Sequence, residues 1–438
     1  MSNVASTAEP SSGRPTANLP VGHLIRISLY WLGLTAIDGA VNGAIQSRVE
    51  FEALVPVSEQ GAALRTIGIL ALLIGIAVQP TIGSISDYTV SRWGRRKPYI
   101  VFGSVIDVVI LLAIAGSHSV LALAALVALL SFSTNIARGP FQGYVPDLVA
   151  PSQVGLASAL VGLMQILGNV TGFALVAIAN IQKDVAIALI GVAVVELVTM
   201  ISVVVRVDDG PPPKSREGRS WWKIAAETWG TDILQERSYV WLVASRLLVL
   251  TGGAMLVNFV IFYLSQTHGL DQSQTGGVQL TLLAVVAIAN IIAVVPAARI
   301  SDRIGRKPVI YVSCAIGGVG LLIAAVAPTV PVALIGAGLF GLSAGMFLAV
   351  DWALMTDIIP KASSGRYMGM SNVATGASTI VALIIGSFAL DFFNATVGVG
   401  VGPRAIYLVG AVAFIIGALL LVPVVEPDRR RRAAALPI

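Results

Sequence analysis

The chain has 438 residues, 56% of them hydrophobic and 12% charged, with a mean hydropathy of +0.86. Soluble domains carry roughly a quarter charged residues, so this composition excludes an ordinary water-soluble protein and predicts an integral membrane protein. The net charge of +5 arises from cations between the apolar runs. That pattern is typical of membrane topology, so we expect no nucleic-acid partner.

The sequence offers no signature of a metal site, a cofactor site or an enzyme. Its single cysteine, Cys314, lies in an apolar run, and the three histidines are far apart, whereas a zinc site needs several ligands at close spacing. A phosphate-binding loop of the type G-x-x-x-x-G-K-[ST] is missing, and so is a nucleophile–base pair. We therefore expect neither metal nor cofactor, and neither an enzyme nor an ATP-driven pump.

Residues 1–22 are rich in Ser, Pro, Ala and Thr and predict a disordered cytoplasmic tail rather than a signal peptide. The bundle that follows, residues 23–206, contains six apolar runs of about the 20 residues that a membrane span requires. These predicted spans cover residues 24–46, 61–83, 98–117, 119–139, 155–180 and 185–206.

A polar seam at residues 207–239 separates this bundle from a second one. Its proline run and mixed charges predict a cytoplasmic linker, and the stretch from Trp221 to Trp229 predicts an amphipathic helix on the membrane surface. The second bundle, residues 240–425, has spans at 240–265, 277–298, 308–328, 331–356, 367–391 and 404–425, before a basic cytoplasmic tail at 426–438. The expected fold is all-α, with twelve transmembrane helices.

The positive charges of the short loops indicate which side of the membrane each loop occupies. The loops after spans two, eight and ten and the C-terminal tail are rich in Lys and Arg. The opposite loops "AGSHSV" and "APTVP" contain no cation, and "ANIQKDVA" contains only Lys183. Since cytoplasmic loops carry the excess of Lys and Arg, we expect a multi-pass protein of the plasma or inner membrane with both termini cytoplasmic.

The two predicted bundles are repeats of one another. Asp38 and Gln46 of span one align with Asn258 and Gln266 of span seven, each 220 residues later. The charged segment "SDYTVSRWGRRKP" after span two has a shorter counterpart, "SDRIGRKP", after span eight, and "YVPDLV" after span four aligns with "LMTDII" after span ten. Three anchors in the same order on the same side indicate a parallel duplication, which is typical of transporters that work by alternating access.

The two charged segments look like the loop signatures of the major facilitator superfamily. The first has four extra residues and the sequence "SRWG", and in this it resembles the sucrose/proton symporters and the glycoside–pentoside–hexuronide cation symporters. The resemblance covers the whole chain through its six-plus-six repeat and implies two pseudo-symmetric six-helix bundles. It also implies a cytoplasmic gate formed by Gly83, Asp87, Gly94, Arg95, Arg96, Asp147, Asp302, Gly305, Arg306 and Asp357.

The resemblance implies roles for several residues of this gate. Gly83 is expected to let span two approach span eleven closely. Asp87 is expected to pair with the loop arginines and with the positive end of the span-eleven helix in the outward-open state, and Asp147 to join the same ion pairs. Ion pairs made in one state and broken in the other bias a two-state equilibrium. The alternative is that these charges only set the topology, although topology does not require the anions.

Asp38, past the middle of span one, is the candidate for proton coupling, because an ionisable residue within a span costs roughly 2.5–3.5 kcal/mol on insertion. Thr35, Asn42 and Gln46 follow the helical spacing and predict one polar stripe with it, beside Trp31. If the stripe lines a cavity between the bundles, these residues contact the solute and Asp38 carries the proton. The alternative is a buried aspartate that hydrogen-bonds a neighbouring span.

Other polar residues within the spans are further candidates for solute binding. Arg138 of span four either pairs with an acid or extends to the membrane surface. The candidates beyond span one are Asn135, Arg138, Gln142, Gln165, Asn169, Asn258 and Gln266. Asp107 and Glu196 are equally compatible with coupling and with structural pairing, and Asp351 is a candidate for the inner gate.

The function predicted from the sequence is secondary active transport of a small polar solute, such as a sugar or glycoside, by proton-coupled symport. The coupling cation is H⁺ or Na⁺, and a monomer in the lipid bilayer is expected. One alternative is a proton-antiporting exporter of amphipathic drugs or metabolites. A more distant alternative is a membrane receptor or scaffold that transports nothing.

Overall fold

The computed structural model describes residues 17–208, 220, 236–358 and 364–425. Twelve helices in this part of the chain are long and apolar enough to cross a membrane, and no β-strand occurs within it. The predicted all-α fold with twelve spans is therefore confirmed. The predicted amphipathic helix near Trp221–Trp229 and the basic C-terminal tail lie outside the described residues.

The N-terminal bundle is built around its first helix. A share of 72% of the most apolar stretch of this helix is buried. That helix, α1, packs against α6 and α7, and α2 packs against α4. The spans are α1 (Val21–Phe51), α2 (Gln60–Ser86), α3 (Lys97–Ala115), α4 (Val120–Phe141), α6 (Val154–Gln182) and α7 (Ala186–Arg206). Short helical turns connect them: η1 (Val57–Glu59), α5 (Tyr144–Leu148) and η2 (Pro151–Gln153).

The C-terminal bundle repeats this arrangement with one interruption. The seventh span, expected to be continuous over 240–265, breaks at Phe259 and continues through one turn of α-helix into a π-helical turn. Its elements are α9 (Arg237–Asn258), α10 (Val260–Phe262), η4 (Tyr263–Thr267), α11 (Gln272–Ile304), α12 (Arg306–Val326), α13 (Val330–Ile358), α14 (Ser364–Thr396) and α15 (Val401–Leu420).

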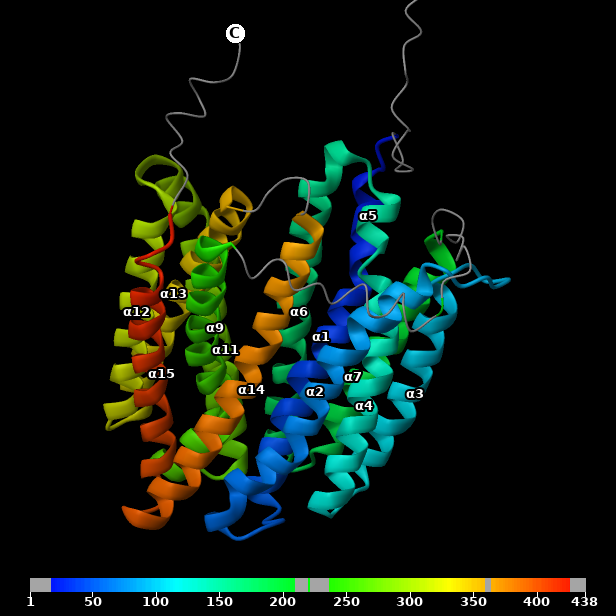
Figure 1. Cartoon of the computed structure of the whole chain (residues 1–438). Helices are drawn as coiled ribbons and strands as arrows, with labels where there is room; N and C mark the ends of the chain where they lie inside the picture. Colours follow the sequence, from blue (N-terminus) through cyan, green and yellow to red (C-terminus); the bar gives the residue numbers. More distant parts are fainter. Residues whose placement is uncertain (1–16, 209–219, 221–235, 359–363, 426–438) are drawn as a thin grey trace, which may run out of the picture.

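The two bundles stand side by side, with α2 packed along α14 and α6 along α11 (Figure 1). The loops after α2 and α11 are the two charged segments, each an island of charge between apolar spans. We therefore call the end where they lie the island end; it is the upper end in Figure 1, where α5 also lies. The opposite end, with the loop at residues 52–59 between α1 and α2, is the far end. Large apolar side chains such as Leu121 and Ile291 are 76% and 71% exposed, as expected of surfaces that face lipid.

Glycines allow the helices of a bundle to approach each other closely. A Cβ added at Gly168 or Gly172 of α6 would lie 2.3 Å from the carbonyl oxygen of Leu32 or of Ala36 in α1, respectively. Without a strong hydrophobic driving force in lipid, such close backbone packing is a main source of helix association. The α1–α6 contact is therefore fixed by the small residues of α6.

Candidate functional site

An ion pair between α1 and α4 lies at mid-depth in the N-terminal bundle. Nη2 of Arg138 lies 2.7 Å from Oδ2 of Asp38 and also donates to the carbonyl oxygen of Leu34 at 3.0 Å. The side chain of Asp38 is 47% exposed, although its neighbours in α1 are buried. Of the two arrangements expected for Arg138, the structure shows the one in which it pairs with an acid.

The polar stripe expected along α1 is divided by the way α1 packs. Trp31 is 8% exposed and packs against Phe141 at the end of α4, with ring centroids 5.7 Å apart. The hydroxyl of Thr35 donates to the carbonyl oxygens of Trp31 and of Gln165 in α6. Neither side chain lies on the exposed face with Asp38. The expectation that both line the cavity is therefore corrected: aromatic and small residues of α4 and α6 cover this part of α1.

Farther along α1, Asn42 and Gln46 meet the break in the seventh span. The side chain of Gln46 donates to the carbonyl oxygen of Val257 at 3.2 Å and accepts from the backbone N–H of Ile261 at 3.3 Å. It thus satisfies backbone groups on both sides of the break, as a helix interrupted within a membrane requires. Asn42 donates to Asn258. These three amides hold the bundles together and are largely buried, with Gln46 at 1% exposure.

A second set of polar residues closes the far end. The carboxylate of Glu50 in α1 accepts from Ser265 at 2.6 Å, from Gln266 at 2.8 Å and from Gln60 of α2 at 3.0 Å. Gln266 also donates to Gln60 at 2.7 Å. Gln266, a predicted solute-binding residue, therefore belongs to a contact between the bundles.

An ion pair joins α2 to α14 beside this contact. Nη2 of Arg65 lies 3.3 Å from Oδ2 of Asp391, and the other carboxylate oxygen, Oδ1, accepts from the backbone N–H of Gly61 at 2.7 Å. The guanidinium group lies over the ring of Phe388 at 3.9 Å and donates to Ser387 at 3.1 Å. These residues were not among the candidates predicted from the sequence. The sequence does place an ionisable residue near the far end of each of the predicted spans two and eleven. Nothing in the sequence, however, pairs positions so far apart in the chain.

The remaining predicted binding residues occupy two environments. Asn169 and Gln142 are exposed; Asn169 donates to the carbonyl oxygen of Gln165 one turn earlier. Asn135 is 6% exposed and donates to the carbonyl oxygen of Ser131. Of the predicted coupling and binding residues, Asp38, Asn169 and Gln142 are thus exposed, and the guanidinium of Arg138 is partly exposed.

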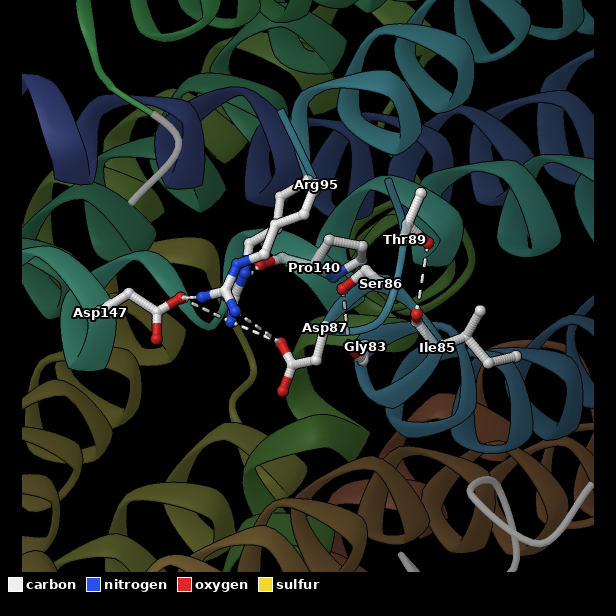
Figure 2. Close-up of polar contacts among 9 residues, drawn as sticks. Gly83, Ile85, Ser86, Asp87, Thr89, Arg95, Pro140 and Asp147 are labelled. Atoms are coloured by element: carbon white, nitrogen blue, oxygen red, sulfur yellow. Dashed lines mark hydrogen bonds and ion pairs between the residues drawn. The ribbon is translucent and has the colours of Figure 1, made fainter. Parts of the chain in front are cut away.

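The first charged loop folds into a compact cluster at the island end. Arg96 lies 2.8 Å from Asp87 and 2.7 Å from Asp147, and Arg95 pairs with Asp147 as well. In Figure 2, Asp87 and Asp147 lie on either side of the cluster at Arg95. Both arginines are at most 5% exposed. Gly143, which follows α4, makes room for them: a Cβ added there would overlap the guanidinium of Arg96.

The glycines of the two charged loops serve as backbone turns. Gly94 and Gly305 have φ angles of 98° and 102°, which residues with a side chain rarely adopt. Gly83, expected to approach span eleven, instead lies against α4, because an added Cβ would lie 3.1 Å from the carbonyl oxygen of Gly139. Gly139, the single glycine of α4, brings the backbone of that helix against α2, and the expected approach of Gly83 to span eleven is not seen in this structure.

The second charged loop has a corresponding but smaller cluster. Nη1 of Arg306 lies 2.8 Å from Asp302, and its Nε lies 3.6 Å from Asp357. Asp302 is 60% exposed and Asp357 is 25% exposed. Asp351, a candidate for the inner gate, instead forms a fully buried ion pair with Arg246 of α9.

The sequence matches the profile of the Major Facilitator Superfamily over residues 53–286 and 242–437. The chain belongs to this superfamily. It is therefore a multi-pass membrane protein of a transporter family and not an enzyme.

Curated relatives of this superfamily member match parts of it. Sucrose transport protein SUT1 of Oryza sativa subsp. japonica is 26% identical over 170 residues, 32% of this chain and 32% of that protein. Sucrose transport protein SUC3 of Arabidopsis thaliana is 29% identical over 23% of this chain and 21% of its own length. The minor myo-inositol transporter IolF of Bacillus subtilis is 27% identical over 28% of this chain and 27% of its own length. The chain thus spans about a third or less of the length of these relatives.

Solved structures share the fold across nearly the whole chain. A mutant of the nucleoside transporter NupG superposes with a TM-score of 0.71 at 12% identity, covering 92% of this chain and 99% of that one. A bacterial homologue of the human lysosomal transporter Spinster, in an inward-facing and occupied conformation, superposes with a TM-score of 0.65 at 14% identity, covering 91% and 94%.

Proposed function

We infer that this superfamily member is a secondary active transporter that couples a polar solute, of the sugar, polyol or glycoside class, to a proton. The observation that carries this proposal is the ion pair of Asp38 and Arg138. It lies at mid-depth, where charges are costly, yet the carboxylate is half exposed. The matched segments of sucrose and myo-inositol transporters support the solute class.

The pair has the chemistry that proton-coupled binding of a hydroxylated solute requires. In the ionised state, the carboxylate of Asp38 forms an ion pair with the guanidinium of Arg138. A proton taken up by this carboxylate removes the charge attraction, and the N–H groups of Arg138 become available to solute hydroxyls. Loss of the proton restores the ion pair and displaces the solute. The exposed amides of Asn169 and Gln142 are further donors and acceptors toward the island end.

Access to this pair is from the island end, because the far end is closed by contacts between the bundles. Glu50, Gln60 and Gln266 form one part of the closure, and Arg65 with Asp391 forms another. In the orientation expected from the positive loops, the island end faces the cytoplasm and the state is inward-facing. The clusters around Arg96 and Arg306 are then positioned to change partners when the bundles rock into the outward-facing state.

Two experiments test this function. Thermal-shift measurements on the purified protein should show stabilisation by one or more sugars, polyols or glycosides, and not by amphipathic cations; stabilisation by the cations alone contradicts the proposed solute class. In proteoliposomes, a pH gradient should then drive accumulation of the solute identified.

The Asp38→Asn variant should lose accumulation driven by the pH gradient but retain exchange of preloaded solute, because the amide still accepts hydrogen bonds and no longer carries a proton. Asp184→Asn, at an exposed position in the loop after α6, is the matched control and should accumulate solute like the wild type. Accumulation that survives in Asp38→Asn refutes the role of Asp38.

A further inference from the structure

Two carboxylic acids are completely buried in the N-terminal bundle, away from the exposed pair. Asp107 lies near the middle of α3 and Glu196 near the middle of α7, and both residues are 0% exposed. The two carboxyl groups lie close enough to interact with each other. They occupy the space enclosed by α1, α3, α4 and α7, the helices that form this side of the bundle.

The groups that face this pair come from all four helices. Ser133 of α4 donates a hydrogen bond to Oδ1 of Asp107, and Tyr30 of α1 and Ser104 of α3 share a hydrogen bond of 2.5 Å beside Glu196. The cation that acts electrostatically on Asp107 is Arg138 of α4, the partner of Asp38. Tyr30, Asp107, Arg138 and Glu196 are thus the ionisable groups of this region.

Several oxygen atoms here lack a hydrogen-bond partner among the described residues: Oδ2 of Asp107, both carboxyl oxygens of Glu196, and the hydroxyl of Thr134. Thr134 is 4% exposed and lies toward Asp107. An unsatisfied buried polar group costs about 1–3 kcal/mol, and two neighbouring carboxylates in an apolar interior do not both ionise. One proton on the pair removes a charge and supplies the donor that these acceptors need.

The helices pack closely around the pair. A Cβ added at Gly33 of α1 would lie 2.3 Å from the hydroxyl of Thr199 and 3.1 Å from Cα of Glu196. A Cβ added at Gly103 of α3 would lie 2.7 Å from the carbonyl oxygen of Ser133. The two glycines bring α1 onto α7 and α3 onto α4 directly around the acids.

We propose that Asp107 and Glu196 form a proton-binding site whose occupancy changes during transport. The proposal rests on the cation-coupled transport proposed above. The pair carries one negative charge when it holds one proton and none when it holds two. Arg138 experiences this charge as well as that of Asp38. A second proton on the buried pair therefore strengthens the ion pair between Asp38 and Arg138, and release of that proton weakens it. The protonation state of the buried pair thereby changes the strength of the exposed ion pair.

The test needs no solute and therefore fails or succeeds independently of the proposed transport function. Full-length protein in lipid is titrated from acidic to alkaline pH while the infrared C=O absorption of protonated carboxyl groups is followed, with ²H₂O to identify the exchangeable proton. We expect a band at neutral pH that decreases as the pH rises. The band should be absent from the Asp107→Asn/Glu196→Gln double variant and unchanged in Asp184→Asn.

Four outcomes overturn the proposal. A band of constant intensity across the titration means that the pair never exchanges a proton, and a band that persists in the double variant belongs to other acids. Disappearance of the band when K⁺ is replaced by Na⁺ at constant pH means that the site binds sodium. If the double variant does not fold, Glu196→Gln alone must shift the position or the pH dependence of the band, and an unaltered band in that variant also refutes the site.

Discussion

At the scale of single residues, Arg246 and Asp351 form an ion pair whose side chains are 3% and 1% exposed. The guanidinium also lies 4.9 Å from the ring centroid of Trp352 and donates to Thr375 at 3.3 Å. Removing one partner of a buried ion pair leaves an uncompensated charge, whereas replacing both by apolar residues is often tolerated.

We therefore expect Arg246→Ala to lower the free energy of unfolding by about 3–5 kcal/mol. The double variant Arg246→Met/Asp351→Leu should lose much less, because no buried charge remains. Chemical denaturation in detergent, followed by tryptophan fluorescence, measures both. Equal losses in the two variants would show that packing around Trp352, and not the unpaired charge, determines the stability.

A substitution at Gly143 tests whether the charged cluster around Arg96 is a gate or only sets the orientation of the protein in the membrane. An alanine there overlaps the guanidinium of Arg96 and must displace it from Asp87 and Asp147. We expect Gly143→Ala to lower the rate of solute exchange about tenfold, equivalent to about 1.4 kcal/mol in the barrier, while the membrane orientation stays the same. Gly155→Ala, where an added Cβ meets no atom within 4 Å, is the control. An unaltered exchange rate in Gly143→Ala favours the role in topology alone.

At the scale of helices, the contact between α1 and α6 depends on glycines that the sequence presents at four-residue spacing. Gly172→Ala places a Cβ 2.3 Å from the carbonyl oxygen of Ala36, and backbone atoms cannot rotate away. We expect a loss of stability of about 1–3 kcal/mol, the usual effect of overpacking. Gly162→Ala in the same helix meets no atom within 4 Å and should be neutral or slightly stabilising. Thermal melting of both variants provides the test, and equal melting temperatures would contradict the packing argument.

At the scale of the whole molecule, the structure places α2 against α14 toward the far end. A Cβ built at Gly68 lies 2.5 Å from Cδ2 of Leu383. In a Cys314→Ala background, which removes the single native thiol, Gly68→Cys/Leu383→Cys should be joined by a short bifunctional thiol reagent.

Cross-linking should stop transport, because the bundles cannot separate at the far end, and reduction of a cleavable reagent should restore it. Each single-cysteine variant, treated in the same way, should keep its activity. Full transport by the cross-linked protein would exclude rocking of the bundles about this contact.

The sequence alone determined the twelve spans, the repeat and the superfamily, because burying a helix in lipid requires a continuous apolar stretch that can be read along the chain. The break at Phe259 escaped prediction, since no Pro or Gly marks it. The side chain of Gln46, from a different span, satisfies the backbone there. Helices such as α11 and α14 are also longer than predicted, because they continue beyond the apolar stretch at both ends.

The tertiary structure decided which polar residues are accessible. Helical spacing placed Trp31, Thr35 and Asp38 on one face, but Phe141 and α6 cover the first two and leave the third exposed next to Arg138. Likewise, Arg65 and Asp391 meet across 326 residues, and Asp107 and Glu196 meet in the interior of one bundle. Pairing of this kind depends on how helices pack, and no local pattern in the chain encodes it.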